Sequence, residues 1–107
     1  MSPHVFHILL SLADRPRHGY GILLDVEERT RGEVVLGTGT VYSAIKRLRQ
    51  LGWIEEVDAP SRSDDDPRRR HYRLTRVGRR ELRAEAERLQ SMVHQARSRA
   101  VLGGTSS

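Results

Sequence analysis

The 107-residue chain contains no cysteine, and this absence removes several kinds of site at once. Without thiols the protein can form no disulfide, no thiolate zinc centre and no cysteine nucleophile. Long apolar runs are missing too, since no stretch approaches the roughly 20 apolar residues of a membrane span. The N-terminus also lacks a basic segment followed by an apolar run, as an export signal would have. We therefore expect a cytoplasmic protein that does not enter a membrane.

Aromatic residues are scarce, at 5% of the chain. The core must therefore be built from aliphatic side chains, and the length suffices for one domain but not for two. Because such a core is small, we expect a second copy of the chain to contribute to stability.

Lysine is nearly absent, since Lys46 stands alone beside eighteen arginines. Residues 1–58 carry seven basic and eight acidic side chains, whereas residues 59–107 carry twelve basic and six acidic ones. A local basic excess in a small chain indicates a polyanionic partner, with double-stranded DNA as the first candidate. The arginine bias also fits a GC-rich genome, so charge alone does not decide the function.

Hydrophobic spacing predicts three short helices followed by a hairpin and a last helix. Apolar residues recur at i, i+3, i+4 and i+7 over residues 3–14, 19–31 and 41–51. Residues 53–57 and 70–74 read as two strands, joined by a segment of loop composition over residues 59–67. The expected fold is mainly α with a small β-hairpin wing, that is, a winged helix-turn-helix plus a C-terminal dimerisation helix.

The third predicted helix turns a polar and basic face away from its apolar stripe. A helix that enters the major groove needs hydrogen-bonding side chains on one face, while its opposite face anchors it to the domain. We expect this face to read base edges and the arginines of the hairpin to follow the flanking phosphates. The alternatives are that Tyr42 only packs its ring and that Lys46 and Arg47 are an ordinary solvated pair. The predicted DNA-binding residues are Thr38, Thr40, Tyr42, Ser43, Lys46, Arg47, Gln50, Arg69, Arg70 and Arg73.

Four sequence blocks resemble those of PadR-type transcriptional regulators and occur in the same order. The blocks are HGYGIL at 18–23, GTVYSAIKRL at 39–48, GWIE at 52–55 and YRLTRVG at 72–78. The resemblance implies a bacterial dimeric winged-helix repressor of the short form, with a single helix after the wing. Some short members hold flat aromatic ligands between aromatic side chains of the last helix, but residues 76–102 contain no aromatic residue.

We divide the chain into a winged-helix DNA-binding domain (1–75), a C-terminal dimerisation helix (76–102) and a disordered tail (103–107). The last helix carries apolar residues at alternating spacings of four and three, which is typical of a seam between helices. Packing of this helix onto its own domain is the alternative. The predicted dimer contacts are Leu82, Ala86, Leu89, Val93, Ala96 and Ala100.

No pattern in the sequence indicates an enzyme or a required cofactor. A nucleophile with its base, a metal-binding set and a phosphate-binding loop are all missing. Trp53 is a candidate contact for a small-molecule effector. His4 and His7 lie one turn apart and are candidate ligands for a divalent transition metal acting as effector, although exposed histidine pairs usually bind nothing.

These observations together predict a sequence-specific transcriptional repressor. We expect it to bind an inverted-repeat operator as a homodimer and to be relieved by a small-molecule or metal effector. The alternative is a winged-helix module that docks onto proteins without specific DNA binding.

Overall fold

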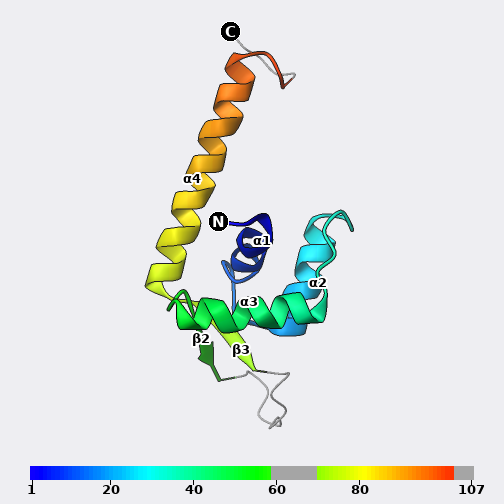
Figure 1. The fold of residues 1–107 in the computed structure, drawn as a ribbon, viewed down its shortest axis with the longest axis vertical. Coiled ribbons are helices and arrows are strands. Elements are labelled where there is room, and N and C mark those ends of the chain that lie inside the picture. Colours follow the sequence, from blue (N-terminus) through cyan, green and yellow to red (C-terminus); the bar gives the residue numbers. More distant parts are fainter. Residues whose placement is uncertain (59–69, 103–107) are drawn as a thin grey trace.

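The computed structural model describes residues 1–58 and 70–102. Figure 1 shows α3 lying across the molecule, with α1 and α2 on one side, the strands on the other, and α4 leaving as a long rod. The order of the predicted helices and hairpin strands is confirmed. In chain order the elements are α1 (Pro3–Ser11), β1 (Arg17–His18), α2 (Gly19–Arg29), α3 (Thr38–Gln50), β2 (Ile54–Val57), β3 (His71–Leu74) and α4 (Arg76–Ser98).

Side-chain caps define where three of the helices begin. The Ser2 hydroxyl accepts a hydrogen bond from the Val5 amide at 3.2 Å, and the Thr75 hydroxyl accepts one from the Gly78 amide at 3.0 Å. The imidazole Nδ1 of His18 does the same for α2, accepting from the Gly21 amide at 2.9 Å. These bonds satisfy amide groups that have no partner inside the helix, so polar residues at these positions set the boundaries.

The sheet has three antiparallel strands in the order β1-β3-β2, and the sequence prediction missed β1. This strand has only two residues, Arg17 and His18, which pair with Tyr72 and His71. Two residues are too few to show an alternating pattern, so β1 exists only because β3 offers it a partner.

The register of β2 against β3 decides which side chains face α3. Ile54 pairs with Leu74 and Glu56 with Tyr72, so these four side chains share one face of the sheet. Glu55 and its partner Arg73 point to the opposite face.

The hydrophobic core is aliphatic apart from Tyr72, as the composition predicts. The core connects the whole domain, because α1, α2, α3, the sheet and the start of α4 each contribute to it. The buried members are Ile8, Leu9, Leu12, Ile22, Val26, Leu36, Val41, Ile45, Leu48, Ile54, Tyr72, Leu74 and Leu82.

A polar cluster beside the core joins α1, β1 and α2. Ser11 is only 1% exposed, and its hydroxyl accepts a hydrogen bond from the Arg29 guanidinium at 2.9 Å. Arg29 also donates to Asp25 at 2.8 Å, while Arg17 donates to the Ser11 carbonyl at 2.7 Å. Burial acts to raise the pKa of Asp25, but the hydrogen bond from Arg29 and the charge of Arg17 hold that pKa below its ordinary value. The carboxylate therefore stays ionised and keeps both arginines in place.

The first turn of α4 packs directly against the backbone before β2. The Thr75 amide donates to the Trp53 carbonyl at 3.0 Å, and the Thr75 hydroxyl donates to the Gly52 carbonyl at 2.6 Å. A Cβ atom at Gly78 would lie 1.9 Å from the Trp53 carbonyl oxygen. Only glycine allows the backbone of α4 to come this close to the Trp53 carbonyl. This contact fixes where α4 leaves the domain.

Gly78→Ala should therefore destabilise the protein, by at least the roughly 1–3 kcal/mol typical of overpacking. Gly39→Ala is the matched control, because a Cβ at Gly39 in α3 has no neighbour within 4 Å. Alanine is favoured over glycine inside a helix by about 0.5–1 kcal/mol, so this control should be neutral or slightly stabilising. Chemical denaturation followed by circular dichroism measures both, and equal effects would contradict the close approach at Gly78.

Candidate nucleic-acid interface

The N-terminal end of α3 is exposed and has no side-chain cap. Gly37 occupies the cap position, and Thr38 and Thr40 are exposed residues within the helix. Among the described residues no side chain caps α3, so its first amide groups can donate hydrogen bonds to an anionic oxygen, which the helix dipole also favours. Both threonine hydroxyls lie beside this end.

The two faces of α3 have opposite character, as the sequence predicts. Val41, Ile45 and Leu48 are buried against the other helices and the sheet. The outward face carries four exposed polar side chains that supply hydrogen-bond donors and acceptors. They are Ser43, Lys46, Arg47 and Gln50.

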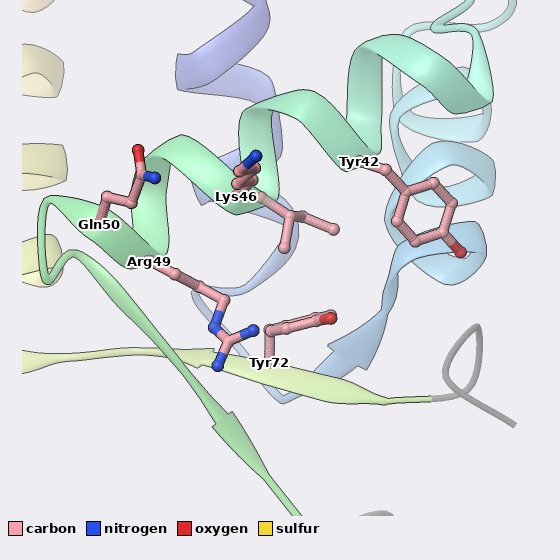
Figure 2. Close-up of a pocket in the computed structure, with 6 residues that line it drawn as sticks. Tyr42, Lys46, Arg49, Gln50 and Tyr72 are labelled. Carbon is pink, nitrogen blue, oxygen red and sulfur yellow. The ribbon is translucent and has the colours of Figure 1, made fainter. Parts of the chain in front are cut away.

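Tyr42 is half-buried at the edge of this face. A Cβ atom at Gly19 would lie 2.6 Å from Cε1 of the Tyr42 ring, so the ring rests on the bare backbone at the start of α2. Packing of the ring is therefore part of its role. Figure 2 shows the phenol oxygen directed away from α3.

A hollow of about 430 Å³ separates α3 from β3 (Figure 2). The Arg49 guanidinium lies 5.9 Å from the centre of the Tyr72 ring, a cation–π arrangement across the hollow. Burial, and then the charge of Glu56, raises the pKa of Tyr72, so its phenol keeps the proton that it can donate. The lining residues are Tyr42, Ile45, Lys46, Arg49, Gln50 and Tyr72.

Of these six residues the predicted site lacks the core residue Ile45 and two residues with polar groups, Arg49 and Tyr72. Arg49 follows Tyr42 and Lys46 at helical spacings of seven and three, which was an available signal. Tyr72 carried no such signal, because only the β2–β3 register turns it toward α3.

The wing arginines are paired with glutamates of β2. The Arg73 Nε atom lies 2.7 Å from Glu55 Oε2, and the Arg70 Nη1 atom lies 3.5 Å from Glu56 Oε1. Both arginines are exposed, and exposed pairs contribute only about 0–1 kcal/mol, so a stronger anion can displace the glutamates. Arg69, also predicted to contact DNA, lies outside the described residues.

The predicted dimer contacts fall in three different environments. Leu82 belongs to the core of its own chain. Leu89 and Ala96 are half-buried, while Ala86 is exposed. Val93 is 42% exposed and its neighbour Met92 is 51% exposed, so the middle of α4 presents apolar surface that its own chain leaves open.

Ala100 lies beyond the end of α4, although the predicted helix extends to residue 102. The helix ends at Ser98, and Ala100 adopts a positive φ of 60°. The Val101 amide then donates back to the Ala96 carbonyl at 2.9 Å, which closes the last turn. Ala100 is therefore not part of a helical seam.

The candidate effector residues differ in burial. Trp53 is half-buried against the core and does not line the hollow between α3 and β3. His4 is exposed, whereas His7 has a buried Nδ1 atom without a hydrogen bond to any described residue. Burial, followed by the charges of Arg29 and His4, lowers the pKa of His7. Residues 1–58 and 70–102 hold no cluster of three metal-binding side chains, and both effector assignments stay predictions.

The three helices, the small sheet beside α3 and the exposed polar face of α3 define a winged helix-turn-helix. The family model for transcriptional regulators of the PadR-like family matches residues 8–84, so the chain belongs to this family. Its members are transcriptional regulators and not enzymes. No curated protein sequence matches the chain. In its described residues, no helix is both long and apolar enough to cross a membrane.

Solved structures show the same fold. A transcriptional regulator from Clostridium thermocellum is 24% identical, with a TM-score of 0.72, and the match covers 88% of this chain and 89% of that one. A PadR family regulator from Clostridium difficile R20291 is 25% identical, with a TM-score of 0.66 and coverage of 87% and 95%. Bacillus subtilis PadR in complex with operator DNA is 22% identical, with a TM-score of 0.68; the match covers 80% of this chain but only 48% of that protein.

The packing of Tyr42 on Gly19 can be tested by stability alone. We expect Tyr42→Ala to lower the free energy of unfolding by about 1–2 kcal/mol, because the ring is only half-buried and a fully buried large side chain contributes about 1.5–3 kcal/mol. Tyr42→Phe keeps the ring and should change the free energy of unfolding by less than about 1 kcal/mol. Chemical denaturation distinguishes the two, and equal losses would show that the hydroxyl, rather than the ring, stabilises the fold.

Proposed function

We propose that the protein is a sequence-specific DNA-binding transcriptional repressor that acts as a homodimer on an inverted-repeat operator. The observation that carries the proposal is the outward face of α3, where hydrogen-bonding side chains are exposed while the opposite side of the helix is locked into the core. A helix held in this way can enter the major groove without losing its position in the domain. The likeness of the fold to a PadR solved with operator DNA supports the same proposal.

Within this proposal the polar residues divide into two groups by position. Ser43, Lys46 and Gln50 read base edges, because they are exposed on the side of α3 opposite its buried residues. The groups at the start of α3 and on the wing bind backbone phosphates, which fix orientation but carry no sequence information. This second group comprises Thr38, Thr40 and Tyr42 in the first turns of α3 and Arg70 and Arg73 on the wing, and Arg47 in the last turn of α3 is assigned to it as well.

Lys46→Ala is the sharpest test of base reading. Loss of a base-edge contact should weaken operator binding by about 1–3 kcal/mol and relax the sequence preference at one base pair. Fluorescence anisotropy against the promoter duplex and single-base variants of it measures both. Tyr42→Phe is the matched comparison, because loss of a phosphate contact should weaken binding to all duplexes alike. An unchanged preference after Lys46→Ala would show that another face reads the bases.

The homodimer rests on the apolar surface in the middle of α4. The molecule is 56 Å long and 28 × 22 Å across, and α4 extends beyond the domain that its first turns complete (Figure 1). Leu89, Met92, Val93 and Ala96 lie on this extension and are covered only in part by their own chain. A second copy of α4 would cover them, and a two-fold dimer would match a two-fold operator.

Leu89→Glu should dissociate the dimer and abolish tight operator binding. Each chain would bring one unpaired carboxylate into the buried seam, and the cost of burying it exceeds what the small neighbouring alanines can offset. Ser91→Glu is the control, because it adds the same charge two residues away on the exposed side of α4. Analytical ultracentrifugation gives the oligomeric state. A Leu89→Glu protein that stays dimeric and binds normally would place the interface elsewhere.

A further inference from the structure

Glu56 lies between two arginines that come from different parts of the fold. Its Oε1 atom is 3.7 Å from Arg49 Nη1 on α3 and 3.5 Å from Arg70 Nη1 beside β3. The side chains are 36%, 46% and 50% exposed for Glu56, Arg49 and Arg70, so all three remain in contact with water. A carboxylate held by two guanidinium groups has the same chemistry as a backbone phosphate held by them.

The register of the sheet places this carboxylate on the side that faces α3. Glu56 pairs with Tyr72, whose ring lines the hollow between α3 and β3 together with Lys46 and Arg49. Figure 2 shows Arg49 reaching from α3 toward Tyr72 across this hollow. If the outward face of α3 enters the major groove, a DNA strand must pass beside the hollow and between α3 and the wing.

Glu55 provides a natural comparison within the same strand. It has the same charge and is also paired with an arginine, Arg73, at 2.7 Å. Its register position turns it to the opposite face of the sheet, away from α3. The two glutamates therefore have the same charge but lie on opposite faces of the sheet.

We propose that Glu56 is an internal competitor for the DNA backbone, occupying the place of one phosphate between Arg49 and Arg70 in the free protein. The inference rests on the proposed function, because it gives Glu56 a role in setting the affinity of the same interface for DNA. On binding, both arginines exchange the carboxylate for a phosphate. Exposed ion pairs of this kind are weak, so the exchange lowers affinity without preventing binding. Because a phosphate contact is blind to sequence, Glu56 sets how tightly the protein holds any duplex and leaves its sequence preference unchanged.

The test measures duplex affinity of the full-length chain carrying Glu56→Gln as a function of salt concentration. We expect affinity for both the promoter duplex and a random duplex to rise about three- to tenfold at low salt, since a like charge next to the phosphate is removed. The slope of log affinity against log salt should change by less than one, because the same phosphate is bound with and without the Glu56 carboxylate. The ratio between the two duplexes should stay constant.

Two comparisons make the result specific to this contact. Glu55→Gln changes the net charge equally but releases Arg73 instead, so any gain that it gives should survive in an Arg49→Gln, Arg70→Gln background. The gain from Glu56→Gln should disappear in that background, and a gain that survives there would overturn the proposal. Thermal unfolding verifies that the variants are folded. A parent protein without preference for any duplex would refute the proposed function, whereas the random-duplex affinities would still decide the role of Glu56.

Discussion

The two-sided character of α3 is the constraint on which the rest of the structure depends. Val41, Ile45 and Leu48 hold this helix against the other elements and are themselves buried. Since these anchors fix the rotation of α3 about its own axis, the polar residues between them can point only outward. Rigid support of this kind is what a binding face needs, because side chains on a loosely held helix would lose their orientation.

The candidate interface contains acidic as well as basic side chains, although the net charge of the chain is +5. The basic excess lies in the second half of the chain, but Glu55 and Glu56 of β2 neutralise two wing arginines across the sheet. The resulting surface offers arginines whose acidic partners can be exchanged. An interface of this kind holds its cations in position before a ligand arrives and moderates attraction to any polyanion.

The position of α4 depends on one close contact at its start. Gly78 brings the helix onto the Trp53 carbonyl, and Leu82 places the next turn in the core. The remainder of the rod therefore leaves the domain in a direction fixed at its base. In the proposed dimer, a small rotation at this base would be amplified along α4 and would change the separation of the two α3 helices.

The sequence alone determined the helices, the hairpin and the outward face of α3, because periodicity and capping residues are local signals. It also placed the family, through four short blocks in the right order. Only the tertiary structure revealed β1, the pairing of Glu56 with two arginines and the hollow beside Tyr72. Each of these depends on strand register and on contacts between residues distant in the chain, and a one-residue shift in register would turn Glu56 and Tyr72 to the other face.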